Sequence, residues 1–265
     1  MSFILHIDAW KLGVYFFILL LLTGWLGIVF QKKDDSDSSS RVEDATMALF
    51  ALLLAFSFSG AADRYEHRKE FLLNEAISIG DFAATSSMLE HQEYQKIKSL
   101  LIEYTKNRIL FGKIKIDDEK MKEITSDARK IQNKIADVLK YIISEKKSNT
   151  IHTPLINGFN GIVMTHDRAY YGSMNQIADT IIIMLIIFGM VSSFLIGRLT
   201  GGHERLIHKL RKILIYVLLV TAVFTVTMDL EQPHRGIMRN PKISLIDLLT
   251  SLESSPKEQD SSKRK

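Results

Sequence analysis

The ionisable side chains best placed to do chemistry in this sequence stand where long apolar runs end. Asp63 and Arg64 follow one such run, and Asp229 and Glu231 follow another, with Arg235 four residues further on. Ionisable residues inside a membrane line ion or substrate pathways, whereas those at the ends of spanning helices usually anchor the helix at the interface. We therefore treat these five residues as candidates for an ion pathway, with interfacial anchoring as the alternative.

Residues for enzymatic or metal chemistry are scarce. The sequence has no cysteine and no Walker, H-E-x-x-H, G-x-S-x-G or G-x-G-x-x-G motif. Of its eight histidines, His203 and His208 stand five positions apart, which does not place them on one helix face for a metal. The sequence therefore predicts a protein that is not an enzyme and that has no catalytic residues, cofactor or metal site.

Three large apolar residues of the second apolar run share one helix face. Phe50, Leu54 and Phe58 follow one another at i, i+4 and i+8. In a symmetric oligomer such side chains would form stacked apolar rings, which gate a pore by expelling water. This makes the three residues a candidate pore constriction. The alternative is that the stripe contacts lipid or packs against a neighbouring helix.

The elements that carry these residues are defined by where charge is absent. The chain has 265 residues, of which 24% are charged, yet four long stretches carry no charge. These stretches lie between positions 11 and 32, 44 and 63, 179 and 198, and 212 and 229. Apolar runs of about 18 residues or more are typical of membrane-spanning helices. The sequence thus excludes a soluble cytosolic enzyme, a secreted domain and an outer-membrane barrel, whose strands alternate over short segments.

The four predicted spans cover about 12–30, 45–62, 180–197 and 213–228. The last is short, because 16 residues at 1.5 Å each give about 24 Å, against a hydrocarbon core of roughly 30 Å. Snorkelling Lys and Arg side chains or a locally thin bilayer would have to make up the difference.

The region between the second and third spans is polar and helical in pattern. Its clearest signal is an apolar stripe over 121–142 with spacings of three and four, which indicates either core packing or an oligomer interface. We also expect one continuous helix from the second span into this region, since Ala45 to Ile79 contain no proline and Gly60 is their only glycine.

These observations predict an all-α protein with four transmembrane helices and a helical bundle inserted between the second and third spans. We expect transmembrane helices 1 and 2 in 1–62, the extramembrane bundle in 63–173, transmembrane helices 3 and 4 in 174–230, and a C-terminal segment in 231–265. That segment should hold a short amphipathic helix from about Ser244 to Leu252 and a disordered tail. The helix would lie along the membrane, clasp a neighbouring subunit or fray.

The charge of the chain bears on its partners and on its orientation. The net charge of +4 and the pI of about 9.0 would suit nucleic acid, but membrane proteins with basic loops reach the same values, so we predict no nucleic-acid partner. The short loops 31–43 and 198–212 are dense in Lys and Arg, which favours their being cytoplasmic and the bundle lying outside.

Three stretches carry a family resemblance. The sequences of Leu53–Arg64, Asn74–Gly80 and Met228–Gly236 resemble the bacterial bestrophin-like domain membrane proteins, an uncharacterised family. The order of spans and helical region also resembles that of bestrophins. Bestrophins are pentameric anion channels with an apolar neck in the second span, and they keep the bundle in the cytoplasm. The acidic calcium clasp of the animal proteins has no clear counterpart, because Asp229 and Glu231 are too few.

Two functions from different classes follow. The first is a homo-oligomeric ion channel or pore of the bacterial inner membrane, lined by the second span. The resemblance implies that this channel is a pentamer and selects anions. Its partners would be the lipid bilayer, further copies of the chain and inorganic ions. The second is a membrane-embedded sensor or scaffold that signals through a partner protein.

Overall fold

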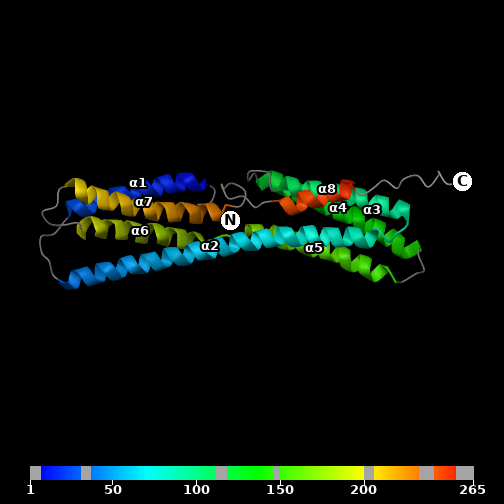
Figure 1. Ribbon diagram of the computed structural model, residues 1–265, viewed down its shortest axis with the longest axis horizontal. Helices are drawn as coiled ribbons and strands as arrows, with labels where there is room; N and C mark the ends of the chain where they lie inside the picture. Colours follow the sequence, from blue (N-terminus) through cyan, green and yellow to red (C-terminus); the bar gives the residue numbers. More distant parts are fainter. Residues whose placement is uncertain are drawn as a thin grey trace. The chain divides into compact units, whose positions relative to one another are not determined.

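Helices make up all of the regular structure in the part of the chain that the structure describes. The computed structural model describes residues 7–30, 37–111, 118–145, 150–199, 206–232 and 242–254, and these ranges contain no strand. Their helices are α1 (Ala9–Val29), α2 (Asp37–Ser86), α3 (His91–Phe111), α4 (Asp118–Glu145), α5 (His152–Met174), α6 (Asp179–Leu199), α7 (Leu206–Leu230) and α8 (Ile243–Ser254) (Figure 1). The predicted all-α class is confirmed.

The helices belong to two compact units. Unit 1 comprises Met1–Glu66 and Asn175–Arg239, and unit 2 comprises His67–Met174 and Asn240–Lys265. Each unit is therefore built from two separate segments of the chain. The tail after Ser254, predicted to be disordered, lies outside the described residues.

Four helices are long and apolar enough to cross a membrane, as the charge-free runs predict. The fourth differs from expectation in length. Helix α7 has 25 residues because it begins at Leu206 and takes His208, Lys209, Arg211 and Lys212 into its first two turns. Its length is about 37 Å, so the whole helix exceeds the hydrocarbon core, while its uncharged part keeps the predicted length. The charge-free run identified the apolar part of this helix but not its start.

Glycines allow close approach of α1 and α6 in unit 1. A Cβ atom on Gly27 would overlap the backbone carbonyl of Phe194, and one on Gly197 would overlap that of Gly24. Backbone therefore lies against backbone, which is the small-residue packing expected between membrane helices. The Ser193 hydroxyl adds a hydrogen bond across this contact, donating to the Leu20 carbonyl over 2.7 Å.

Helix α2 is a single helix of 50 residues that passes through Gly60 without a break. This confirms the continuity expected from the absence of proline. One glycine in a helix interior costs about 1 kcal/mol relative to alanine, which neighbouring packing easily offsets. At 1.5 Å per residue the helix is about 75 Å long, and it contributes one part of its length to each unit.

Unit 2 is built around a core that includes the stripe of α4. Most of the stripe residues are buried in this core, among them Ala128, Ile135 and Ile142. The stripe therefore packs inside the bundle, which settles the choice between core packing and an oligomer interface for these side chains.

Helix α8 is the predicted amphipathic helix, and it packs within unit 2. Leu245 and Leu252 are buried in the unit 2 core. Lys242 Nζ donates to the Ile109 carbonyl over 3.0 Å, and Lys106 forms an ion pair of 2.8 Å with Glu253. The sequence suggested that this helix lies along the membrane, clasps a neighbouring subunit or frays. In the structure its buried leucines instead pack against the other helices of unit 2.

Candidate functional site

The three residues of the predicted constriction lie in two different environments. Phe50 and Leu54 are only 2% and 8% exposed, and both belong to the core of unit 1. Phe58 is 38% exposed. The structure therefore brings Phe50 and Leu54 together inside the subunit and leaves Phe58 at its surface.

Two of the predicted span-end residues form a direct ion pair. Nε of Arg64 donates to Oε1 of Glu231 over 2.8 Å, and Nη2 of Arg64 lies 2.6 Å from the same oxygen. The other carboxylate oxygen of Glu231 accepts a hydrogen bond of 3.0 Å from the backbone N–H of Ile177. Since Glu231 is fully buried, one carboxylate connects α2, the end of α7 and the residues that precede α6.

The next residue extends this connection to α1. The side-chain oxygen of Gln232 accepts a hydrogen bond of 3.0 Å from the N–H of Ala9, and its amide nitrogen donates to the Ile7 carbonyl over 2.7 Å. We call Arg64, Ile177, Glu231 and Gln232, together with Ala9, the junction clamp. Sequence reasoning missed Gln232 because no motif distinguishes it.

The other predicted span-end residues are Asp63, Asp229 and Arg235. Asp63 is exposed and Asp229 is buried. Arg235 lies outside the described residues. Within the described residues no three His, Asp or Glu side chains are grouped so that they could hold a metal ion. The junction clamp fixes helix ends relative to one another, which is a positioning role.

Unit 2 contains a second buried polar cluster, which sequence reasoning missed. Arg108 donates from Nε to Oε1 of Glu75 over 2.6 Å and from Nη2 to Oε2 over 3.2 Å. The Tyr104 hydroxyl donates to Glu75 Oε1 over 3.1 Å, and Nδ1 of His166 lies 3.1 Å from that hydroxyl. Nε2 of Gln132 also donates to it, over 3.4 Å.

One sequence signal could have pointed to this cluster. The apolar stripe of α3 runs through Ile97, Leu101 and Tyr104, and its next position on the same face is Arg108. A charged residue in such a place must be paired when it is buried. Glu75 adjoins Ala76, which is buried in the core of unit 2.

The charges of this cluster hold Glu75 ionised. Burial by itself would raise the pKa of the Glu75 carboxyl. The attraction of the Arg108 guanidinium, with hydrogen bonds from His166 and Arg108, outweighs burial and lowers that pKa to about 2. For Tyr104, burial and the neighbouring Glu75 carboxylate raise the pKa of the hydroxyl. The cluster is therefore a permanent ion pair at neutral pH.

The low pKa of Glu75 makes the free energy of unfolding of unit 2 depend on pH in the acidic range. Because the folded pKa of Glu75 is depressed, its stabilising contribution is fully present above the unfolded value of 4.5 and is lost as pH falls towards about 2. We expect the advantage of the wild type over Glu75→Gln in thermal unfolding to shrink across this range. Glu70→Gln, which changes an exposed carboxylate, should show no such dependence. A difference in unfolding temperature between the wild type and Glu75→Gln that stays constant across this pH range would contradict the lowered pKa of Glu75.

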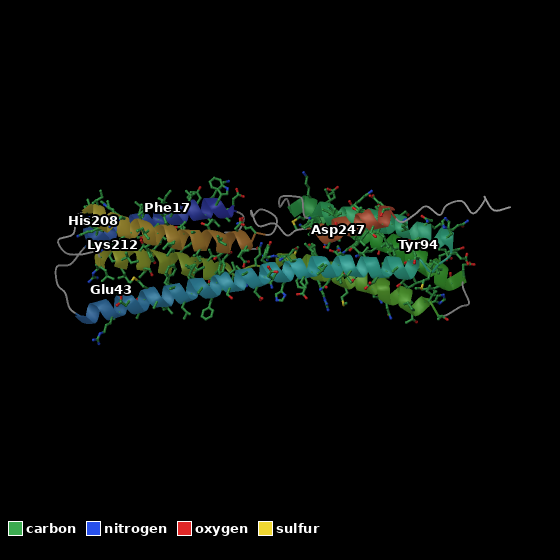
Figure 2. The ribbon with its side chains drawn as sticks, viewed as in Figure 1. Phe17, Glu43, Tyr94, His208, Lys212 and Asp247 are labelled. Carbon is green, nitrogen blue, oxygen red and sulfur yellow. The ribbon has the colours of Figure 1, made fainter. Side chains whose placement is uncertain are left out.

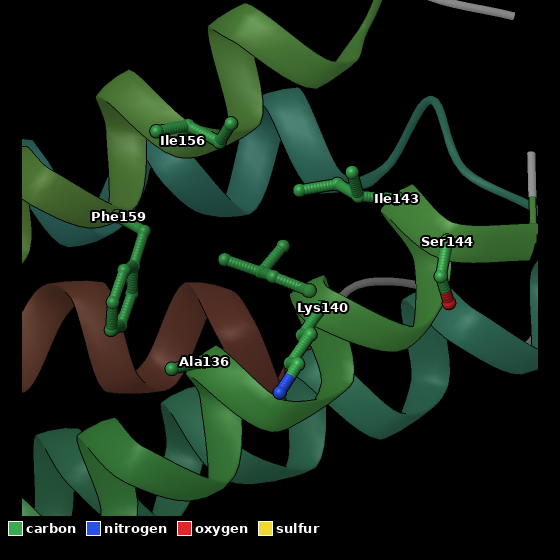
Figure 3. A pocket seen from close by; sticks show the side chains of 7 residues that line it. Ala136, Lys140, Ile143, Ser144, Ile156 and Phe159 are labelled. Atoms are coloured by element: carbon green, nitrogen blue, oxygen red, sulfur yellow. The ribbon is translucent and has the colours of Figure 1, made fainter.

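An apolar cavity of about 410 Å³ lies between α4 and α5 in unit 2 (Figure 3). Its lining consists of Ala136, Leu139, Lys140, Ile143, Ser144, Ile156 and Phe159. Lys140 is the only ionisable residue in this lining, so the cavity holds no acid–base pair. Its surface suits an apolar molecule.

Comparisons with known proteins place these features in a family. A family profile described as "Bestrophin-like domain" matches residues 14–240. A crystal structure of a bacterial bestrophin homologue from Klebsiella pneumoniae, a point variant, is similar with a TM-score of 0.71 and 11% identity, covering 90% of this chain and 97% of that one. A second variant from the same organism gives a TM-score of 0.70 and 12% identity over 94% and 96% of the two chains. No curated protein matches the chain.

Proposed function

The chain belongs to the family of bestrophin-like domain proteins, and from this membership we propose that it forms a homo-oligomeric ion channel of the bacterial inner membrane. The proposal includes the bundle between the second and third spans as an extramembrane part of each subunit. A pentamer is the assembly we would test first, since the resemblance implies it.

The observation that carries this proposal is the uncovered apolar face of α2. In the apolar 18-residue stretch of α2, 22% of the residues are buried, whereas the corresponding stretches of the other three spanning helices have 33 to 39% buried. Leu49, Leu52 and Phe56 are exposed at spacings of three and four, so they form a stripe on one face. Helices of several copies that surround an axis with this face would build an apolar pore lining.

The predicted constriction takes a modified form in this proposal. Phe58 is exposed in one copy of the chain, but it lies about 160° around the helix from Phe56, so it would face away from the stripe of Leu49, Leu52 and Phe56. Phe50 and Leu54 would support the lining helix from within the subunit, since they pack in its core. The proposal thus keeps the second span as the lining element but places the lining on Leu49, Leu52 and Phe56 instead of the three residues first expected.

Ion preference follows from the charges beyond the apolar stripe. The resemblance implies anion selectivity. On the exposed side of α2, however, the first charged residues after Phe58 are Asp63 and Glu66. Rings of carboxylates attract cations and repel anions. We therefore favour cation selectivity for a pore lined by this face.

Asp63→Asn should shift the reversal potential in a salt gradient towards that of anions, because it removes one carboxylate from each subunit. The measurement is made on purified protein in planar bilayers. Glu145→Gln, which changes an exposed glutamate at the end of α4, serves as the matched control and should leave the reversal potential unchanged. An unchanged reversal potential in Asp63→Asn would show that this residue does not face the ion path.

The same bilayer recordings test the function itself. A channel of this kind gives discrete single-channel currents from purified wild-type protein. If no current occurs at any pH, calcium concentration or tension applied, the channel proposal fails. If currents occur but Asp63→Asn leaves the reversal potential unchanged, only the role of Asp63 fails.

The cavity between α4 and α5 favours a second candidate, a membrane sensor that signals through a partner. An apolar ligand bound there would contact Ile156 and Phe159 of α5. A stoichiometric second protein retained with solubilised wild-type chain, and lost from Ile156→Asp, would support it. Isolation of a homo-oligomer alone would favour the channel.

A further inference from the structure

The apolar cavity between α4 and α5 opens to solvent beside one basic side chain. Leu139 at its floor is buried in the core of unit 2, whereas Lys140 and Ile156 at its rim are exposed. Figure 3 shows the lining side chains of α4 and, across the space from them, Ile156 and Phe159 of α5. A molecule from solution can therefore reach an apolar space whose entrance carries an ammonium group.

Lys140 differs from two neighbouring lysines of α4 in having no carboxylate partner among the described residues. Nζ of Lys130 lies 2.9 Å from Oδ1 of Asp127, and Nζ of Lys134 lies 3.6 Å from Oε1 of Glu103. Within the described part of the chain, no ion pair or side-chain hydrogen bond involves Lys140. Its ammonium is therefore available to a negatively charged ligand.

The cavity has no acidic side chain in its lining. Its 7 lining residues come from α4 and α5 and include no Asp or Glu. Asp247, labelled in Figure 2, belongs to α8, which contributes no lining residue. Positions 146–149, which follow α4 and lie outside the described residues, contain two lysines and no Asp or Glu in sequence. A carboxylate bound in the cavity would therefore meet no carboxylate of the lining.

An unsatisfied nitrogen lies on the face of α5 that lines the cavity. His152, Ile156 and Phe159 follow one another at i, i+4 and i+7, so they share one helix face. His152 is 8% exposed, and its Nε2 is buried with no hydrogen-bond partner among the described residues. A buried polar atom without a partner destabilises the protein. A ligand oxygen that accepts a hydrogen bond from this nitrogen would relieve that cost.

We propose that the cavity between α4 and α5 binds a free fatty acid of medium chain length. The alkyl chain packs on Leu139, Ile143 and Phe159, and the carboxylate accepts hydrogen bonds from Lys140 Nζ and His152 Nε2. The volume of about 410 Å³ is at the lower end of the roughly 300–1,000 Å³ of small-molecule sites, which suits one alkyl chain better than the two of a phospholipid. The inference gives the sensor candidate a ligand class and rests on that candidate's cavity, yet binding needs neither a signalling partner nor conduction.

The proposal is tested by equilibrium dialysis of radiolabelled decanoate against full-length protein in lipid nanodiscs, with binding to empty nanodiscs subtracted. Decanoate should bind saturably. Decanol, which has the same chain without the charge, should bind about tenfold more weakly, because it loses a hydrogen bond between charged groups. Butyrate keeps the carboxylate but buries far fewer methylenes, so it should bind about 1,000-fold more weakly.

Four variants assign the binding to this cavity. Lys140→Met removes the ammonium but keeps a long side chain, so it should lower decanoate affinity about fivefold and leave decanol affinity unchanged. Lys140→Arg keeps the charge and should retain the affinity. Lys134→Met is the matched control, since it lies on the same helix outside the lining, and it should change neither affinity. Ala136→Phe fills the cavity and should abolish the binding of both probes.

Three outcomes would overturn the proposal. Equal affinity of the wild type for decanoate and decanol, or unchanged decanoate affinity in Lys140→Met, would show that the site does not recognise a carboxylate. Undiminished decanoate binding in Ala136→Phe would place the ligand elsewhere. Binding to nanodiscs that hold one chain, but not to those that hold an oligomer, would show that a second copy covers the cavity. Since dialysis measures binding directly, absence of current or of a partner protein leaves this result unaffected.

Discussion

Arg108→Met lowers the free energy of unfolding of unit 2 by about 3 to 5 kcal/mol, because it leaves the Glu75 carboxylate buried without its partner. Both side chains are at most 1% exposed, so water does not replace the lost ion pair. The loss is measured by hydrogen exchange of the backbone amides of α3 and α4 in the full-length protein in detergent micelles.

A double-mutant cycle separates the buried charge from the loss of packing. Glu75→Leu combined with Arg108→Met removes both charges, and replacement of a whole buried ion pair by apolar residues is often close to neutral. The double variant should therefore recover most of the stability that Arg108→Met loses. Equal destabilisation in the single and double variants would show that packing, and not the unpaired carboxylate, causes the effect.

Glu231→Ala should destabilise unit 1 by about 3 kcal/mol. It removes the hydrogen bonds of a charged group to Arg64 and leaves the N–H of Ile177 without its acceptor. Because Arg64 is partly exposed, its guanidinium can turn to water, and the loss should be smaller than for a fully buried pair. The measurement is the unfolding temperature of the solubilised protein.

Asp44→Asn is the matched control for this variant, since it neutralises an exposed carboxylate of the same helix in unit 1. It should change stability by no more than about 0.5 kcal/mol. If the protein is a channel, Glu231→Ala should also alter its conductance by loosening the position of α2. Unchanged stability in Glu231→Ala would contradict the role assigned to the junction clamp.

The helices of this fold are largely predictable from sequence because a membrane imposes strict local rules. An uncharged run long enough to span the bilayer identifies a helix without knowledge of its neighbours. Likewise, the absence of proline sufficed to predict that α2 is continuous. The start of α7 was missed because its first turns contain basic residues, which a charge-free criterion excludes.

The polar clusters could not be predicted, because their members are distant along the chain. Arg64 and Glu231 are 167 residues apart, and no local pattern says that they meet. The residue types at span ends drew attention to both, but their pairing depends on how the helices pack. Glu75 and Arg108 are 33 residues apart and on different helices, so the same reason applies to them.

The division of the predicted constriction has a geometric cause. Each step of four residues advances a side chain by about 40° around a helix, since an α-helix has 3.6 residues per turn. Phe58 is therefore turned by about 80° from Phe50, which is enough to move it from the core to the surface. A stripe built only from steps of four drifts around the helix, whereas alternation of three and four holds one face.

Within unit 2, the unbroken backbone of α2 also sets the direction in which each of its side chains points. The angle between the side chains of Glu75 and Phe82 is determined by the seven positions that separate them. Insertion of one residue between them would turn Phe82 by about 100° relative to Glu75, whereas insertion of seven would return it to within about 20°. A single inserted residue would therefore turn Phe82 out of the unit 2 core while Glu75 keeps its ion pair with Arg108.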